Sequence, residues 1–276
     1  MSTLTVTTAA DSVADDGNLS LREAVAQANA TADADTIRFA DGLEGKTLML
    51  THGELVLRRE VTIDGDRDND GKEVTLSGGG ESRILRIEEA WPSPDEADVR
   101  LEDLSLIEGR SPEGENGGAI LLGGGSLALA QCIVSDSASM RDDLSHGGNG
   151  GGIYAATGSR LALSDSTISR NEADGFGGGS GIGTGKGVQL RIHNSLLTDN
   201  GGSTTMPAAA PLPFPPASCC WKTAFSLTTP RVSVSMAASA AAYGSGTARR
   251  RSPGAKSPAT GAMAAVASLP ISAALP

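Results

Sequence analysis

Short segments in which every second residue is apolar recur along the first two hundred residues. Leu161 and Leu163 show this alternation, and so do Leu190 and Ile192. An alternation of period two is typical of strands that bury one face. Gly-rich or polar residues separate the segments, so the pattern predicts many short strands and an all-β fold. The strands expected upstream are Thr3–Thr7, Thr36–Phe39, Thr47–Leu50, Glu54–Leu57, Val61–Ile63, Val74–Leu76 and Ile84–Ile87.

A unit of about thirty residues repeats downstream. Related six-residue motifs begin at Leu101, Leu129, Leu163 and Ile192, at offsets of 28, 34 and 29 residues. Three short strands per unit predict a chain that coils and stacks on itself, which is a parallel β-helix. Each unit carries a polar residue after its alternating strand: Asp103, Gln131, Asp165 and Asn194. We expect these residues to stack at one corner and to satisfy turn backbone groups, a structural role rather than a catalytic one.

One helix is predicted, at Leu21–Ala30. Ser20 and Glu23 form an S-x-x-E capping box, which is a sequence signal for a helix start. Apolar residues at helical spacing share one face: Leu21, Ala24, Val25 and Ala28. The end of a solenoid needs a cover, so we expect this helix to cap the first coil.

The composition divides the chain in two. Residues 1–200 hold all 33 acidic residues and 16 of the 22 Lys and Arg, whereas residues 201–276 hold six cations and no Asp, Glu or Asn. We therefore expect an N-terminal cap with the first coils at 1–90, β-helix repeats at 91–204 and a low-complexity, disordered tail at 205–276. The acidic body disfavours nucleic acid as a partner. No apolar stretch reaches the roughly 18–20 residues of a membrane span.

The tail resembles an out-of-frame translation of further repeats. When Ala217–Arg231 is written as degenerate codons and read from the third base of each, it gives L-L-E-[ND]-S-x-[LF]-S-[ND]-N. That pattern matches Leu190–Asn200, LRIHNSLLTDN, and begins about one repeat further on. We therefore expect a shifted reading frame near residues 201–206. A chain cut short in this way would be a monomer or an aggregation-prone fragment, because its last coil would expose open edges.

The segment Leu19-Ser-Leu-Arg-Glu-Ala resembles the C-S-L-R-E-A signature at the start of bacterial secreted right-handed β-helix proteins. Leu19 stands where that signature has Cys. The resemblance is specific over residues 1–90 and generic over 91–200. It implies a secreted or cell-surface protein, adhesin-like or similar to polymorphic outer-membrane proteins, although no classical signal peptide is visible. It implies no single agreed activity.

An acidic loop is the sharpest candidate for chemistry. Asp66, Asp68 and Asp70, followed by Gly71, match the D-x-D-x-D-G half of a calcium loop, and Asp64 adds a further carboxylate. Calcium prefers six to eight oxygen ligands, which closely spaced carboxylates supply. The predicted ligands of a structural Ca²⁺ ion are Asp64, Asp66, Asp68, Asp70 and the Lys72 carbonyl. Ser77 occupies the place of the bidentate Glu, and a solvated acidic turn is the alternative.

We predict a structural or adhesive role with no catalytic residue, and partners among glycans or host and cell-surface proteins. The alternative is a polysaccharide lyase or hydrolase acting along the β-helix face. Asp165 with Asp136, or Arg160 and Arg191 together with the polar corner series, would then carry the chemistry, but their spacing does not single them out. The three histidines are expected at the surface: His52, His146 and His193. Cys132 is expected to be a buried thiol.

Overall fold

The computed structural model describes residues 2–14, 16–66, 71–88, 98–142, 144, 146–175 and 179–201, and the backbone of 234–237. All of these belong to the first of two compact units, which spans 1–240. The second unit, 241–276, and most of the expected tail at 205–276 lie outside the described residues.

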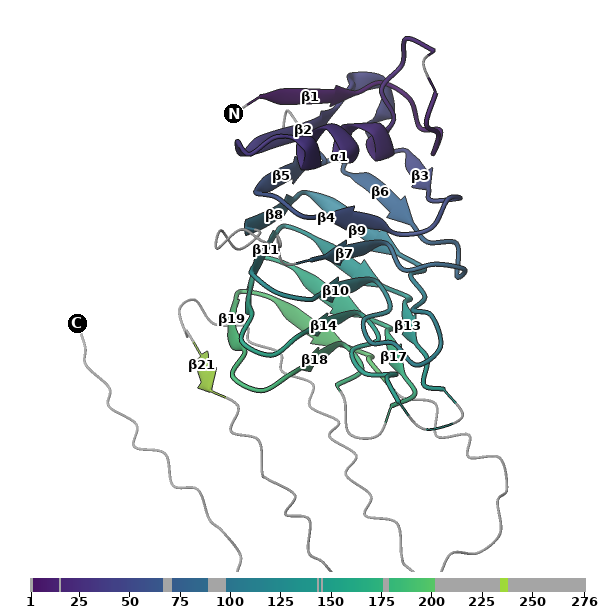
Figure 1. The fold of residues 1–276 in the computed structure, drawn as a ribbon. Helices are drawn as coiled ribbons and strands as arrows, with labels where there is room; N and C mark the ends of the chain where they lie inside the picture. The colour runs from purple at the N-terminus through teal and green to yellow at the C-terminus, as the bar shows by residue number, and fades with distance from the viewer. Residues whose placement is uncertain are drawn as a thin grey trace, which may run out of the picture. The chain divides into compact units, whose positions relative to one another are not determined.

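The described chain is a parallel β-solenoid with three long sheets (Figure 1). The first sheet holds, in spatial order, β1 (Thr3–Val6), β2 (Asp35–Phe39), β5 (Val61–Asp64), β8 (Asp98–Glu102), β11 (Ser126–Ala130), β15 (Arg160–Ser164), β19 (Gln189–His193) and β21 (Val234–Ala237). The second holds β18 (Ile182–Thr184), β14 (Ile153–Ala155), β10 (Ile120–Leu122), β7 (Leu85–Ile87) and β4 (Leu55–Leu57). The third holds β20 (Leu196–Thr198), β16 (Thr167–Ser169), β12 (Ile133–Ser135), β9 (Leu104–Ile107), β6 (Val74–Ser77) and β3 (Thr47–Met49).

Two small elements complete the fold. Strands β13 (Ala138–Ser139) and β17 (Glu172–Ala173) pair in a short parallel sheet, and a 3₁₀ turn, η1, covers Asp41–Leu43. Every strand pair is parallel except β19 with β21, which is antiparallel. The predicted parallel β-helix is therefore confirmed, and each upstream strand expected from the sequence lies within a residue or two of its predicted bounds.

The core runs along the inside of the stack. In-register partners place like residues above one another, as in Leu127 with Leu161 and Leu161 with Leu190. Leu127 and Leu161 are each 1% exposed, while the alternate residues of these strands face outward. The alternation in these strands thus determines both the face that each one buries and its register.

Helix α1 (Leu21–Ala30) packs at the N-terminal end of the stack, beside β1, β2 and β4 (Figure 1). The Ser20 hydroxyl accepts a hydrogen bond from the Glu23 N–H at 3.2 Å, and Glu23 Oε2 accepts one from the Ser20 N–H at 2.8 Å. This is the predicted capping box. The four predicted apolar positions of the helix are all buried. The expectation of a capping helix is confirmed.

Polar residues stack at two corners of each coil. The predicted series Asp103, Gln131, Asp165 and Asn194 adopts the left-handed backbone conformation, with φ between 44° and 54°. Asp and Asn tolerate this conformation better than β-branched residues. A second left-handed series follows the third-sheet strands: Glu108, Asp136, Arg170 and Asp199. The second series has the same offsets of 28, 34 and 29 residues, so the repeat spacing would have located it.

Inside each corner, a side chain of one coil accepts a hydrogen bond from the backbone of the coil before it. The Cys132 N–H donates to Ser166 Oγ at 3.1 Å, and the Ser166 N–H donates to Ser195 Oγ at 3.1 Å. Cys132 is 1% exposed, and burial raises the pKa of its thiol to about 12, which confirms the predicted buried thiol. These inner ladders satisfy backbone groups that no strand partner reaches.

A buried ion-pair cluster joins three coils where the second-sheet strands begin. Arg83 is 1% exposed and donates to the carbonyl of Gly117 at 2.8 Å. Its guanidinium also contacts Glu54 Oε2 at 2.5 Å and Glu115 Oε2 at 2.8 Å. Arg86 bridges the same two carboxylates at 2.8 and 2.9 Å. The buried guanidinium of Arg83 is therefore both ion-paired and hydrogen-bonded, and these contacts offset the cost of burying its charge.

Candidate functional site

The acidic loop leaves the first sheet at the end of β5, and its described residue Gly65 lies against Asp103 in the corner of the next coil. Asp64 is 8% exposed and pairs with Arg38 Nε at 3.1 Å, and Asp66 is 4% exposed and accepts the Gly71 N–H at 2.8 Å. A Cβ on Gly65 would stand 2.1 Å from the Asp103 carbonyl oxygen, so only glycine fits this approach. The described part of the loop is held against the corner.

Carboxylates from two coils converge at this corner. The pKa of Asp103 is raised to about 6, first by burial and then by the charges of Asp64, Asp66, Glu102 and Glu73. Like charges held this close disfavour one another's ionised forms. A bound cation would relieve the repulsion.

The structure tests the predicted calcium ligands only in part. Asp64, Asp66 and Lys72 are described, while Asp68 and Asp70 lie outside the described residues. The Lys72 carbonyl accepts the Gly45 N–H at 3.0 Å, so it already serves the coil. Within the described ranges, no group of three or more His, Cys, Asp or Glu side chains has a metal-holding arrangement. The calcium site remains a prediction.

Ser77, at the place of the bidentate Glu, is fully buried. Its hydroxyl donates to Glu108 Oε2 at 2.8 Å and accepts the Gly79 N–H at 3.1 Å. These hydrogen bonds stabilise the corner after β6. The Ser77 hydroxyl is therefore engaged within the coil and not in the acidic loop.

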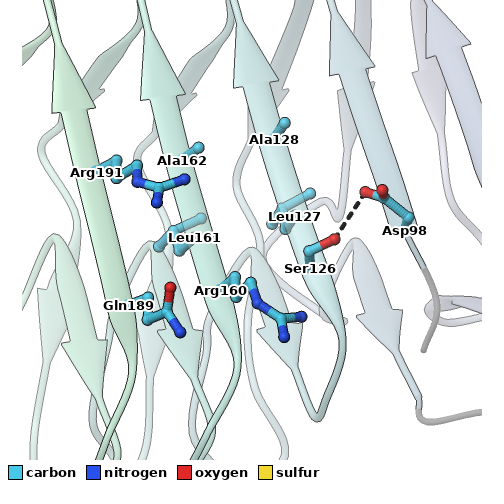
Figure 2. Close-up of a pocket in the computed structure, with 9 residues that line it drawn as sticks. All are labelled: Asp98, Ser126, Leu127, Ala128, Arg160, Leu161, Ala162, Gln189 and Arg191. Carbon is cyan, nitrogen blue, oxygen red and sulfur yellow. Dashed lines mark hydrogen bonds between the residues drawn. The ribbon is translucent and has the colours of Figure 1, made fainter.

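A second feature is a hollow on the outer face of the first sheet, with a volume of about 230 Å³ (Figure 2). Its lining residues come from four neighbouring strands: Asp98, Ser126, Leu127, Ala128, Arg160, Leu161, Ala162, Gln189 and Arg191. In the strand register, Ser126, Arg160 and Gln189 form one row, and Ala128, Ala162 and Arg191 form the next. The small side chains of Ala128 and Ala162 leave the space, and two guanidiniums border it.

The charges on this face are unevenly distributed. The outward positions of β15 and β19 carry Arg160, Arg191 and His193 with no carboxylate. On β8 the outward residue Asp98 accepts the Ser126 hydroxyl at 2.7 Å, and Arg100 lies 3.6 Å from Glu102. The guanidiniums of Arg160 and Arg191 thus lie on the β15 and β19 side of the hollow, and the carboxylate of Asp98 lies on its β8 side.

The structure separates one of the two residue pairs considered for catalysis and brings the other together. Asp136 belongs to the second corner series, where its ion pair with Arg170 at 2.6 Å lowers the pKa of its carboxyl. Asp165 belongs to the first corner series and accepts the side-chain amide of Asn194. These two carboxylates lie on different ladders. Arg160 and Arg191, in contrast, are brought together at the hollow.

The three histidines do not meet at one site. His52 lies 3.5 Å from Asp11, His146 lies 3.0 Å from Asp142 in its own loop, and His193 is exposed on β19. Their side chains are 65% exposed at His52 and 69% exposed at His146, which confirms the expected surface positions.

No family model, curated protein or solved structure matches this chain. In the part of the chain that the structure describes, no helix has the length and apolar character needed to span a membrane.

Proposed function

We propose that this chain is a structural and adhesive β-solenoid of a secreted or cell-surface protein, and that the hollow on β11, β15 and β19 binds acidic glycans. The observation that carries the proposal is the pair of guanidiniums, Arg160 and Arg191, on adjacent strands at the border of that hollow. Guanidiniums bind carboxylates through paired charge-assisted hydrogen bonds. The resemblance of Leu19–Ala24 to a signature of secreted bacterial β-helix proteins supports the location.

A repeating surface suits an extended polymer. Strands in a sheet are spaced about 4.8 Å apart, so successive coils offer a glycan chain regularly spaced positions along the stack. Ser126 and Gln189 add neutral hydrogen-bonding groups between the charged side chains. The affinity of such a face is modest, because exposed ion pairs contribute only about 1 kcal/mol each.

The test is the binding of polygalacturonate, an acidic polysaccharide, compared with dextran, a neutral one. Replacing both Arg160→Gln and Arg191→Gln is expected to weaken polygalacturonate binding about tenfold, from two contacts of about 0.5–1 kcal/mol each. Arg100→Gln is the matched control, because Arg100 faces outward on the same sheet but does not line the hollow. Equal affinities of the double variant and the control would refute the proposal, and so would equal binding of dextran.

We further propose that the 64–72 loop holds a structural Ca²⁺ ion. The support is the D-x-D-x-D-G pattern that begins at Asp66, together with the carboxylates of the neighbouring coil, whose charges act with burial to raise the pKa of Asp103. Ca²⁺ at about a hundred times its Kd would stabilise the fold by about 2.7 kcal/mol, a rise in Tm of at least about 5 °C. The Asp66→Asn variant should lose this rise, while Asp16→Asn, at an exposed position, should keep it. Identical melting of the unmodified chain in Ca²⁺ and in chelator would refute the site.

The enzymatic alternative rests on the same two guanidiniums, which would hold a uronate in a lyase. Of the described residues that line the hollow, Asp98 carries the one carboxylate, and it is hydrogen-bonded to Ser126. A glycoside hydrolase requires a pair of carboxyl groups across the scissile bond. Analysis of the polysaccharide after incubation distinguishes adhesion from turnover.

A further inference from the structure

The last described coil differs from the one before it in how well it is covered. In the preceding coil, Leu161, Leu163 and Ile168 are at most 2% exposed. Their counterparts Leu190, Ile192 and Leu197 are only partly buried. Within the described residues, β18 and β20 are the outermost strands of their sheets, and β19 pairs with the antiparallel β21. The parallel stack therefore presents apolar positions and open strand edges at this end.

The inner ladders specify what a further coil would have to carry. The Ser166 N–H donates to Ser195 Oγ, and the Asn171 N–H donates to Asn200 Oδ1 at 3.1 Å. In each case the acceptor lies 29 residues after the donor. By the same geometry, the next coil would supply a hydroxyl to Ser195 from position 224 and an amide oxygen to Asn200 from position 229.

The alternative reading frame supplies these residues in register. Each codon of the alternative frame joins the third base of one given codon to the first two bases of the next. Inserting one nucleotide upstream therefore produces this frame, and each new residue keeps the position number of the given residue that it replaces. For any synonymous codons, position 219 then becomes Leu, Met or Val, position 221 becomes Leu and position 223 becomes Asn or Asp. Position 226 becomes Leu or Phe when Ser226 is written TCN.

These positions fall where the solenoid needs them. Position 223 lies 29 residues after Asn194, and Asn194 lies 29 residues after Asp165, its partner in the corner ladder. Positions 219, 221 and 226 are the equivalents of Leu190, Ile192 and Leu197. The frame also admits Ser at 224 and Asn at 228 and 229. It admits Gly at 208–210, the positions equivalent to the Gly-rich segment 179–181 that precedes β18.

The given frame fits the same positions poorly. If the given residues formed the next coil, Thr would fall at both left-handed corner positions, where a β-branched side chain is strained, and Ala would fall where the ladder needs a hydroxyl. The residues of the given frame at these seven positions are Cys219, Trp221, Thr223, Ala224, Ser226, Thr228 and Thr229.

We infer that one nucleotide has been lost near codons 201–206, and that the open end formed by β18, β19 and β20 is the seat of a further coil encoded at positions 208–229 of the alternative frame. That coil would place a parallel strand on each of the three edges and cover the three partly exposed apolar side chains. In the given chain, β21 pairs with one of these edges in the opposite direction.

The test compares the given chain with a frame-restored chain of the same length. One nucleotide is inserted after codon 201 and one is removed after codon 230, so the two chains differ only at 202–230. Amide hydrogen exchange is then measured in β18, β19 and β20. We expect at least tenfold slower exchange of these amides in the frame-restored chain, and a higher Tm, because exposed edge strands open most easily.

A third chain is the control. It carries the restored frame with Asp codons at positions 219 and 221, which would place charges on the inward face. This chain is expected to exchange as fast as the given one. Unchanged exchange in the frame-restored chain, or slowing that is equal in the control, would overturn the inference. So would coding DNA from independent isolates that keeps the given frame through codons 201–206.

Discussion

The inner ladder at Asn171 gives the sharpest test of how the coils are held together. Asn171 is fully buried, and its Oδ1 accepts the Ser137 N–H at 3.1 Å. Its Nδ2 donates to the Val134 carbonyl at 3.0 Å and to Asn200 Oδ1 at 3.0 Å. The side chain therefore connects three successive coils. Replacing Asn171→Ala removes all of these bonds and leaves a small void.

The expected cost follows from the groups left behind. Ser137 is 1% exposed, so the substitution leaves its N–H without its acceptor and away from water, at a cost of about 1–3 kcal/mol. The lost bonds to the Val134 carbonyl and to Asn200 add about 0.5–1.5 kcal/mol each, so the free energy of unfolding should fall by about 2–6 kcal/mol. A whole domain is stable by only about 5–15 kcal/mol, so this loss is readily measured.

Urea unfolding followed by circular dichroism measures the loss as a lower midpoint at an unchanged slope. Asn18→Ala is the matched control, because Asn18 is exposed, and surface substitutions usually change stability by less than about 0.5 kcal/mol. A loss below about 1 kcal/mol for Asn171→Ala would refute the reasoning that the ladder carries stability between coils.

Three further predictions concern single side chains. When the protein is kept in chelator, the pKa of Asp103 lies near 6, above its ordinary value of 3.8. Protonation of Asp103 therefore stabilises the folded chain fully below about pH 3.8, and this stabilisation is lost as the pH rises through 6. The Asp103→Asn variant should remove that part of the Tm–pH profile, and an unchanged profile would contradict the pKa. Arg83→Met should lower the free energy of unfolding by about 1–3 kcal/mol in urea, because it leaves the buried Gly117 carbonyl without its guanidinium donor, while Arg86 still pairs with both carboxylates. Arg58→Met, at an exposed ion pair, should cost under about 1 kcal/mol. Cys132 should react with a thiol reagent at pH 8 only after unfolding, and rapid labelling mapped to Cys132 by peptide mass spectrometry, apart from Cys219 and Cys220, would show that this thiol is accessible.

The coil register could be predicted because the same side chains that alternate in the sequence fill the core. Leu161 and Leu163 are inward residues, and the polar Asp165 that follows them marks the corner. The capping helix was equally accessible, since Ser20 and Glu23 are local neighbours that bond to each other. Local periodicity and local capping carry these features, so this sequence alone was sufficient to predict them.

The buried Arg83 cluster could not be predicted in the same way. An arginine just before a strand usually indicates a surface position. Its partners Glu54 and Glu115 lie 29 and 32 residues away, and only the lengths of the intervening loops bring them together. The hollow on the outer face has the same origin, because Arg160 and Arg191 meet through strand register rather than through a motif.

The acidic loop shows the limit of a local motif. The D-x-D-x-D-G pattern identified a cluster of carboxylates, and the structure adds Asp103, Glu102 and Glu73 from neighbouring segments. The sequence places Asp103 only in the corner series. In the structure its left-handed φ of 50° belongs to that corner, and its carbonyl also lies against Gly65 of the acidic loop. Stacking of the coils brings a turn of one coil next to a loop of another. The residue spacing within a single repeat cannot predict a contact of this kind.

The central claim is that the outer face binds an acidic glycan and leaves it intact. Incubating the full chain with end-labelled polygalacturonate, and then measuring both the bound fraction and the polymer length, tests this claim most directly. We expect saturable binding that weakens as salt is added, with the polymer recovered at its original length. Shortened chains with new reducing ends or unsaturated termini, abolished by Arg160→Gln with Arg191→Gln, would contradict the account and establish an enzyme.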